Sequence, residues 1–315
     1  MQYIQSSSLK PVICPAKIRI GTRKSNLALA QANEVKNRLL GAFPELTQDQ
    51  IELVTFDTMG DLIQDKHLAE IGGKGLFTKE LEESLRAGEI DFAVHSMKDM
   101  PYELPEGMVA DCIVEREDSR DAFVSNISSS IESLPEGAVI GTSSIRRHVQ
   151  IKKHRPDIKI VQFRGNVNTR LRKLDDGEVD ATILAVAGLK RLGKEDRITS
   201  IIDKEFMMPA IAQGAICIEY LKANPHIKDV LDKINHEVSR VCITAERSFL
   251  TTLEGSCVTP IGGNAYFEED GKLFFKGFIA DIEGKEFYFA ERRGTSRDAF
   301  KMGQEVGKEI LKRMS

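Results

Sequence analysis

Basic side chains are concentrated in one stretch of this 315-residue chain, between Gly141 and Lys173. The stretch holds ten Lys or Arg residues against one acidic residue, a formal charge of +9, whereas the net charge of the chain is −4. Arg146, Arg147 and Arg164 stand where predicted strands end and helices begin, positions at which backbone N–H groups and the helix dipole favour anions. Because arginine binds carboxylates through two parallel hydrogen bonds, the pattern predicts a ligand with several carboxylates or phosphates.

The other basic residues of the stretch are interpreted as a solvated face of the protein. This interpretation covers Lys152, Lys153, Arg155, Lys159, Arg172 and Lys173. Outside the stretch, Arg23 occupies the matching turn after an earlier predicted strand, and Lys98 follows another strand. We expect these two cations to face the same ligand.

One carboxylate, Asp99, lies among these cations, directly after Lys98 and shortly before Pro101. Neighbouring positive charge stabilises its charged form, so it could hold a developing cation or move a proton. A role as an N-cap or turn aspartate is the alternative. His95, on the strand that leads to Asp99, is interpreted as a satisfied core histidine rather than a catalytic one.

The five cysteines are far apart and form no Cys-x-x-Cys pair, which favours a reducing compartment over a disulfide framework or a zinc site. Cys112, Cys217 and Cys242 lie in apolar runs and are interpreted as core thiols. Cys257 lies in a predicted loop, where a cysteine can be a nucleophile or an attachment point.

The glycine-rich segment 72–75 does not match the P-loop pattern. We interpret it as part of a mobile lid in which Lys74 can reach anions. The six histidines are scattered, so no metal site is predicted.

Hydrophobic periodicity predicts the elements that must position these residues. Apolar runs predict strands at 17–21, 51–56 and 91–97, and helical spacing of apolar residues follows Ser25 and recurs at 76–87. Strands separated by helices indicate a parallel α/β sheet.

A second unit of the same kind begins at residue 139. There the segment VIGTSSIRR repeats the I-G-T of IRIGTRKS, and GEVDATI (177–183) repeats GEIDFAV (88–94) in the same order. These echoes predict a pair of related α/β domains. Strand-like segments at 108–115 and 215–221 predict two crossovers, hence a hinge with a ligand cleft between the domains.

The C-terminal part differs in kind, because a helix at 244–253 and a final helix through Met302, Val306, Ile310 and Met314 flank three antiparallel strands. The predicted fold class is therefore α/β, with two hinged α/β domains and a small α/β C-terminal domain. We expect a flexible tail at 1–16, domain 1 at 17–114 and 215–235, domain 2 at 115–214, and domain 3 at 236–315.

The composition excludes several classes of protein. Hydrophobic residues make up 41% and charged residues 29%, which are globular proportions, and no apolar run reaches the length of a membrane span. The negative net charge argues against a bulk nucleic-acid binder, and the basic stretch has Phe163 as its only aromatic residue. We expect a cytoplasmic monomer that binds neither nucleic acid nor membrane.

Seven longer motifs are similar to those of the porphobilinogen deaminase family, also called the hydroxymethylbilane synthases. They are IGTRKSNLALAQA (20–32), GGKGLFTKELE (72–82), HSMKDMP (95–101), IGTSSIRR (140–147), FRGNVNTRL (163–171), LAVAGLKRLG (184–193) and EGSCVTPIG (254–262). The resemblance covers residue 18 to the C-terminus. It implies two periplasmic-binding-protein-like domains and a third domain with the cofactor loop.

The resemblance also implies a transferase that joins four porphobilinogen molecules head to tail, with loss of ammonia, to give hydroxymethylbilane for haem and other tetrapyrroles. A dipyrromethane cofactor, bound through a thioether at Cys257, would prime the chain, and Asp99 would be the acid–base residue. The motifs imply carboxylate or cofactor contacts at Arg23, Ser25, Lys74, Lys98, Ser144, Arg146, Arg147, Arg164, Arg170 and Arg191.

The implied chemistry agrees with the charges read from the residues. Each pyrrole carries an acetate and a propionate, so the number of carboxylates rises as the chain grows. More arginines are then needed to bind them. Loss of ammonia leaves a cationic methylene-pyrrolenine, which Asp99 could stabilise. A non-catalytic anion-binding module with the same fold is the alternative, and Ehrlich's reagent, which colours a covalent dipyrromethane, distinguishes the two.

Overall fold

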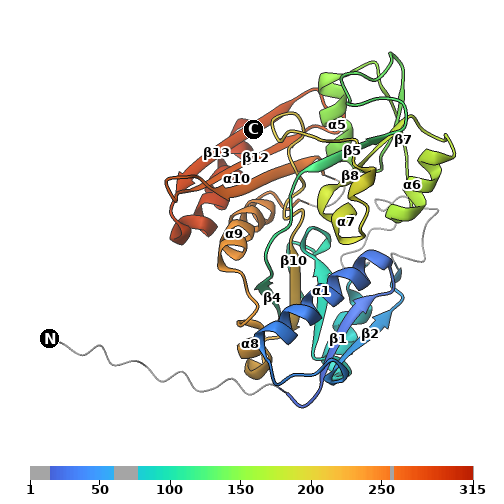
Figure 1. The fold of residues 1–315 in the computed structure, drawn as a ribbon. Coiled ribbons are helices and arrows are strands. Elements are labelled where there is room, and N and C mark those ends of the chain that lie inside the picture. The colour runs from blue at the N-terminus through green and yellow to red at the C-terminus, as the bar shows by residue number, and fades with distance from the viewer. Residues whose placement is uncertain (1–14, 60–76, 256–258, 315) are drawn as a thin grey trace.

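The structure, a computed structural model, describes residues 15–59, 77–255 and 259–314. Three sheets organise these residues (Figure 1). The predicted α/β class, with two α/β domains followed by a small C-terminal one, is confirmed by the sheet topology. None of the described helices combines the length and apolar character needed to cross a membrane.

The first sheet has five strands in the order β2-β1-β3-β10-β4. These strands are β1 (Ile18–Arg23), β2 (Ile51–Phe56), β3 (Phe92–Ser96), β4 (Met108–Ile113) and β10 (Ile216–Leu221). β2 and β3 lie parallel to β1, whereas β10 lies antiparallel between β3 and β4. We name this sheet domain 1, together with α1 (Asn26–Ala42), the short helix η1 (Gln48–Gln50), α4 (Lys79–Ala87) and α8 (Pro225–Leu231).

The second sheet repeats this topology in the order β7-β6-β8-β5-β9. Its strands are β5 (Asp121–Ser125), β6 (Val139–Gly141), β7 (Lys159–Val161), β8 (Ala181–Ala185) and β9 (Ser200–Ile201). β6 lies parallel to β7 and β8, and β5 is antiparallel to β8 and β9. We name this sheet domain 2, together with α5 (Ile145–His154), α6 (Val167–Asp175), α7 (Val186–Arg191) and η3 (Glu195–Arg197).

The two domains share one local arrangement of a glycine and an aspartate, which explains the repeated G-E-x-D sequence. Gly88 follows α4 with a φ of 68°, and the glycine after α6 has a φ of 77°, a conformation that only glycine adopts readily at a helix end. Asp91 then accepts a hydrogen bond from the Arg19 N–H at 2.7 Å. Asp180 accepts the equivalent bond from the Val139 N–H at 2.7 Å. Each aspartate thereby holds the start of an inner strand of its sheet, β1 in domain 1 and β6 in domain 2.

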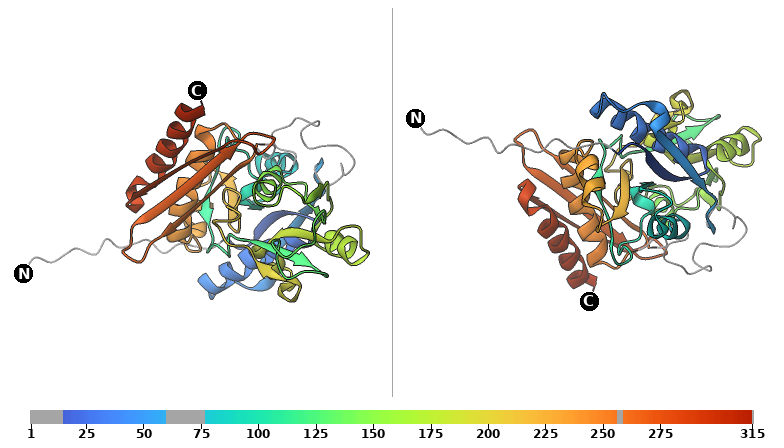
Figure 2. Two further views of the ribbon diagram at one scale, coloured as in Figure 1. Left: turned by 90° about the horizontal axis from the view of Figure 1, so that it is seen from above. Right: turned by 90° about the horizontal axis from the view of Figure 1, so that it is seen from below.

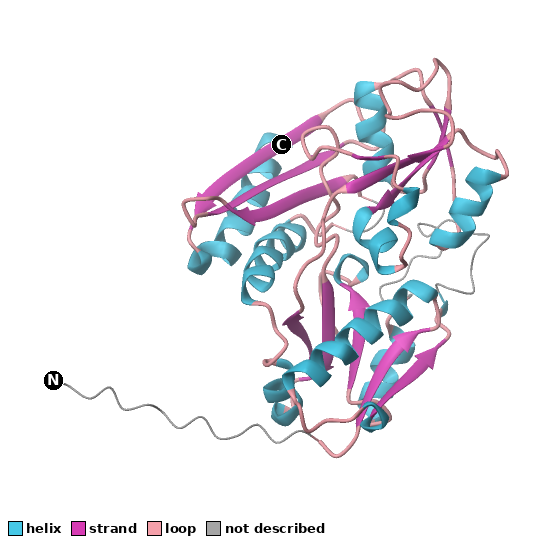
Figure 3. Ribbon diagram, in the orientation of Figure 1, coloured by secondary structure: helices cyan, strands magenta, loops and turns pink. Residues whose placement is uncertain are grey.

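The third sheet is antiparallel and belongs to the C-terminal part (Figure 2). Its elements, named domain 3, are α9 (Glu237–Thr252), β11 (Ile261–Phe267), β12 (Leu273–Ala280), β13 (Phe287–Gly294), η4 (Ser296–Asp298) and α10 (Ala299–Met314). α9 and α10 pack together against the sheet (Figure 3). Phe278 of β12 belongs to a separate hydrophobic cluster with Val149 of α5 and Met208, so domain 3 also contacts domain 2. Met314, predicted on the buried face of the last helix, is 45% exposed.

The chain crosses between domains 1 and 2 twice, after β4 and after β9. Glu246 of α9 is fully buried, and its carboxylate accepts hydrogen bonds from Nη1 of Arg116 in the first crossover and the Ala212 N–H in the second, both at 2.6 Å. It also accepts one from the Ala265 N–H of β11 at 2.8 Å. One carboxylate thus anchors both crossovers to domain 3.

Candidate active site

Loops at the carboxyl ends of parallel strands carry several of the predicted site residues. β1 ends at Arg23, and Ser25 caps α1 by accepting a hydrogen bond from the Ala28 N–H at 3.3 Å. Ser144 follows β6 and caps α5 in the same way, accepting from the Arg147 N–H at 3.4 Å. Ser25 and Ser144 therefore occupy equivalent helix N-caps in the two domains.

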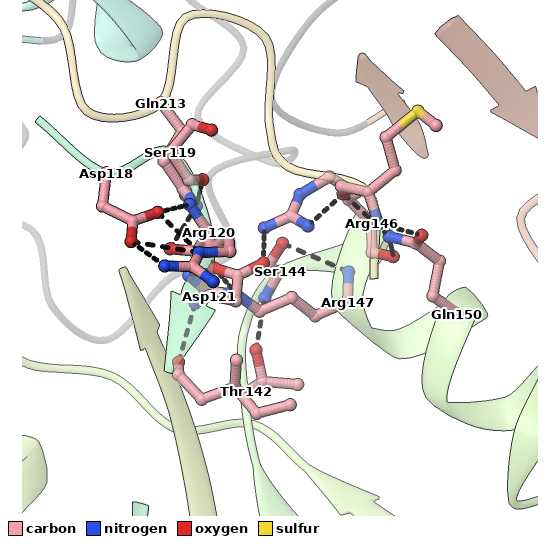
Figure 4. Close-up of polar contacts among 12 residues, drawn as sticks. Asp118, Ser119, Arg120, Asp121, Thr142, Ser144, Arg146, Arg147, Gln150 and Gln213 are labelled. Atoms are coloured by element: carbon pink, nitrogen blue, oxygen red, sulfur yellow. Dashed lines mark hydrogen bonds and ion pairs between the residues drawn. The ribbon is translucent and has the colours of Figure 1, made fainter. Parts of the chain in front are cut away.

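Asp121 binds both of the arginines in the first turn of α5 (Figure 4). Its Oδ2 lies 2.8 Å from Nη2 of Arg146, and its Oδ1 lies 2.6 Å from Nη2 of Arg147. Burial raises the pKa of Asp121, but the two guanidinium groups lower it by more, so the pKa lies below its usual range. Sequence reasoning missed Asp121; an acidic residue directly before the apolar residues of the strand DAFVS is the signal that could have found it.

Further hydrogen bonds fix the two arginines within domain 2. Nη1 of Arg146 donates to the Met208 carbonyl at 2.6 Å, and Nη1 of Arg147 donates to a β8 carbonyl at 2.8 Å. Gln213, from the second crossover, donates to Asp121 Oδ1 at 3.0 Å. The side chains of Arg146 and Arg147 are only 4% and 8% exposed. Each is already paired with a protein carboxylate, that of Asp121. Nε of Arg146 is nevertheless buried without a hydrogen-bond partner among the described residues.

Lys98 brings a domain 1 cation to these arginines. It lies in η2 (Met97–Asp99), the short helix that follows β3. Burial lowers the pKa of its ammonium and the α5 arginines lower it further, while the charges of Asp99 and Asp121 raise it. Lys98 of domain 1 is therefore electrostatically coupled to Asp121 and the α5 arginines of domain 2.

Two more predicted arginines join the group from the region of α6. The pKa of Arg170 is lowered to about 10, first by burial and then by the positive charges of Arg147 and Arg164. Its Nε donates to the Gly165 carbonyl at 2.8 Å. We name the combined set the cationic group: Lys98, Arg146, Arg147, Arg164 and Arg170.

Asp99 stands at the end of η2, beside Lys98 of the cationic group. It is exposed, and its carboxylate makes no hydrogen bond or ion pair within the part of the chain that the structure describes. The alternative role of Asp99 as an N-cap is not supported, because its side chain makes no capping hydrogen bond with the described residues. An available carboxylate next to several cations can accept a proton or stabilise a positive charge.

Two of the predicted arginines have other partners. The guanidinium carbon of Arg23 lies 4.3 Å from the centre of the Phe77 ring. Arg191, the last residue of α7, has its Nε 2.9 Å from a carboxylate oxygen of Glu34 on α1. The structure thus joins Arg191 to domain 1 by an ion pair that the sequence did not predict.

Lys74 and Cys257, together with the predicted lid at 72–75, lie outside the described residues. The interpretation of Cys112, Cys217 and Cys242 as core thiols is confirmed, because all three are buried and free. His95 is also buried, with Nε2 3.1 Å from Oε2 of Glu219. No group of three or more His, Cys, Asp or Glu residues in the described ranges could hold a metal ion.

The interpretation of Arg155 as a solvated residue is wrong. Its side chain is 18% exposed and pairs with Asp157 at 2.6 Å. Its Nη1 also donates to the Ile131 and Glu132 carbonyls at 2.8 and 3.0 Å. Arg155 therefore anchors the loop before β6. Its position at the end of a helix gave no sign of these contacts, because the accepting carbonyls belong to an earlier segment of the chain.

We expect Asp121→Asn to lower the free energy of unfolding by about 3–5 kcal/mol, because removing one partner leaves buried arginines without a counterion. The depressed pKa of Asp121 means that its contribution is complete above the ordinary aspartate pKa of about 4 and is lost as the pH falls through the depressed value. Urea unfolding between neutral and acid pH tests this. Asp157→Asn, which breaks the more exposed pair with Arg155, is the control and should cost much less. Equal losses in the two variants would contradict the role of Asp121.

Comparisons with known proteins support one family. The model described as "Porphobilinogen deaminase, dipyromethane cofactor binding domain" matches residues 18–229, and that described as "Porphobilinogen deaminase, C-terminal domain" matches 240–312. "Porphobilinogen deaminase, chloroplastic" of Pisum sativum is 48% identical over 302 residues, 95% of this chain and 82% of its own. The porphobilinogen deaminase of Paracoccus denitrificans is 49% identical over 293 residues, 93% of both chains.

A solved structure, the methionine-binding protein MetQ, superposes on 70% of this chain and 91% of its own length. The TM-score is 0.44, at 16% sequence identity.

Proposed function

We propose, from the premise that this chain belongs to the porphobilinogen deaminase family, that its cationic group binds the carboxylates of substrate and cofactor and that Asp99 is its acid–base residue. The family's activity is that of a transferase, which polymerises porphobilinogen in tetrapyrrole biosynthesis with a dipyrromethane cofactor. The observation that carries the proposal is the electrostatic coupling of four arginines and Lys98, beside a carboxylate, Asp99, that makes no hydrogen bond or ion pair with the described residues.

The residues of the cationic group fit a ligand with several carboxylates. Arg147 and Arg164 each lower the pKa of Arg170, so the three positive charges lie close enough to repel one another. Asp121 supplies one negative charge to two arginines, and the buried Nε of Arg146 lacks an acceptor among the described residues. An anionic group held here would relieve this repulsion. Dipyrromethane, attached at Cys257, would supply the pyrrole carbon to which each new unit is joined.

Substrate carboxylates would reach the remaining proposed contacts, Arg23, Ser25, Lys74, Ser144 and Arg191. Ser25 and Ser144 support this assignment because both stand at helix N-termini, where backbone N–H groups favour anions. Two equivalent N-caps in repeated domains give an elongating polyanion two anchoring points. The domain 2 arginines would hold the carboxylates nearest the attachment point.

Asp99 would act where positive charge develops. When the aminomethyl group of porphobilinogen leaves as ammonia, the substrate becomes cationic, and the arginines alone would repel it. The Asp99 carboxylate can stabilise this cation, accept hydrogen bonds from pyrrole N–H groups and take up the proton that the carbon–carbon bond formation releases. Its exposed position, with no hydrogen bond or ion pair to residues 15–59, 77–255 and 259–314, leaves it available for each successive unit.

The test is the mass of the intact protein, followed by peptide mapping and Ehrlich's reagent. A mass excess equal to dipyrromethane that maps to Cys257, with a positive colour reaction, is the expected result. An unmodified, colourless protein that binds anions would instead support a non-catalytic binding module. We also propose that the protein is cytoplasmic, which its three buried free thiols support. We further propose that it is a monomer, which light scattering of the purified protein tests.

Arg146→Leu or Arg147→Leu should prevent attachment of the cofactor, whereas Arg23→Leu should permit attachment and stall chain growth. The reason is that Arg146 and Arg147 lie in the N-terminal turn of α5 and belong to the cationic group, while Arg23 ends β1 in domain 1. Intact-protein mass spectrometry measures the outcome. Arg172→Leu, at an exposed position of α6, is the control and should keep the full cofactor mass. Equal cofactor content in all four variants would contradict these separate roles in cofactor attachment and chain growth.

A further inference from the structure

A second network of ion pairs joins domains 1 and 2, and it centres on Glu34. One carboxylate oxygen of Glu34 lies 2.9 Å from Nε of Arg191, and the other lies 3.1 Å from Nη2 of Arg38. Glu34 and Arg38 are one turn apart on α1, whereas Arg191 closes α7 of domain 2. A single carboxylate therefore ties the two domains through one arginine and is shared with a second arginine of its own helix.

Arg191 has donors that these contacts do not use. Its Nη1 donates to the Gly214 carbonyl at 3.1 Å, but its Nη2 is buried and has no hydrogen-bond partner among the described residues. The side chain is 9% exposed, and it borders an open groove of about 600 Å³. The groove is lined by Ala30, Asn33, Glu34, Asn37, Arg38 and Arg191. A buried donor without an acceptor costs free energy. A substrate carboxylate that accepted a hydrogen bond from Nη2 of Arg191 would remove this cost.

We propose that Glu34 is a positioning residue that holds Arg191 at the domain boundary and competes for it with the carboxylates of porphobilinogen and its growing chain. The inference rests on the proposed role of Arg191 as a carboxylate contact. Glu34 need not touch substrate, because it acts by occupying Nε of Arg191 until a substrate carboxylate replaces it.

The surroundings of Glu34 favour such an exchange. When Arg191 turns to a substrate carboxylate, Glu34 keeps its bond to Arg38, and at 28% exposure it is also accessible to water. Arg38 in turn lies 3.8 Å from Glu115 of the first crossover. No charge is therefore left buried and unpaired by the exchange, which is the usual penalty for breaking an internal ion pair. The exchange also removes a tie between the domains at the moment the chain lengthens.

Glu34→Gln should lower the KM for porphobilinogen by about two- to fivefold, since a partly exposed ion pair changes an equilibrium by only this much. The amide keeps the shape of the side chain but competes for Arg191 without a charge. Steady-state kinetics of the holoenzyme gives KM and kcat separately, and kcat should change less than KM. A purely structural role would lower kcat or stability and would not improve KM.

Arg38→Gln provides a test of opposite sign. Without Arg38, Glu34 has Arg191 as its principal partner and binds it more tightly, so KM should rise by a similar factor. Lys190→Gln is the matched control, because it breaks the 2.7 Å ion pair between the neighbouring residue of α7 and Glu117 without touching Arg191. Its KM should equal that of the wild type.

A double-mutant cycle shows whether Glu34 acts through Arg191. Arg191→Gln should raise KM, and adding Glu34→Gln in that background should have no further effect. Electrospray mass spectra at limiting porphobilinogen supply a second readout: the Glu34→Gln protein should retain longer bound chains than the wild type.

The outcomes separate the two assignments. If Arg191→Gln raises KM while Glu34→Gln and Arg38→Gln match the wild type in KM and in bound chain lengths, the role of Glu34 is overturned and that of Arg191 stands. An unchanged KM in Arg191→Gln overturns both.

Discussion

Asp99→Asn is expected to keep the attached cofactor and to bind porphobilinogen, but to lose ~10²–10⁴ in turnover. The amide can accept a pyrrole N–H hydrogen bond, yet it has no charge for the substrate-derived cation and exchanges no proton at neutral pH. Because Asp99 is exposed and makes no hydrogen bond or ion pair with the described residues, we expect the free energy of unfolding to change by less than about 0.5 kcal/mol. A large rate loss in a fully stable protein would identify a chemical role.

Single-turnover release of ammonia is the measurement that isolates this step. Asp99→Glu restores the charge at a different distance and should keep a small residual rate. If the Asn variant released ammonia at the wild-type rate, Asp99 would be only a turn residue, and the reaction would need another acid.

Cys257→Ser should leave a folded protein with little or no turnover. A loop thiol contributes little to packing, but its thioether anchors the unit to which every new ring is joined, and a hydroxyl is the weaker nucleophile for forming that bond. The protein should lack the cofactor mass and give no colour with Ehrlich's reagent. Wild-type activity without a covalent pigment would remove the attachment role from Cys257.

The buried cysteines provide the matched controls for this substitution. Burial is the main cause that raises the pKa of each thiol, to about 12 for Cys242 and further for Cys112 and Cys217, so none is a thiolate at neutral pH. Changing any of them to Ala should lower stability by about 1–2 kcal/mol and leave the cofactor attached. A control that lost the cofactor while remaining folded would make the Cys257 result uninformative about attachment.

Local sequence patterns predicted the elements of the fold well, because their causes are local. The strand at 51–56 has the expected bounds, since an apolar run and flanking turn residues determine them. The predicted return of the chain at 215–221 is confirmed as β10 between β3 and β4. The helix expected at 244–253 begins seven residues earlier, at Glu237, because its first turns are covered by tertiary contacts rather than marked by a clear apolar period.

The side-chain partners within the site were less predictable, because they depend on contacts between distant segments. Arg146 and Arg147 were expected to face a ligand, and nothing nearby in the sequence indicated that Asp121, some 25 residues away, would form an ion pair with each of them. Arg191 and Glu34 are 157 residues apart and meet only because the two domains contact each other. Sequence reasoning could identify which residues carry charge, whereas their pairing follows from the fold.

The position of β10 also sets an order on the synthesis of the chain. Domain 1 contributes its first strand at Ile18, but β3 and β4 have no shared neighbour until β10 is complete at Leu221. The strands of domain 2, in contrast, are continuous from Asp121 to Ile201. As the chain emerges from the ribosome, domain 2 can therefore close its sheet first, although domain 1 is translated earlier. Until then domain 1 exposes unpaired strand edges, and a chain truncated between residues 201 and 216 would contain every strand of the second sheet but lack β10 of the first.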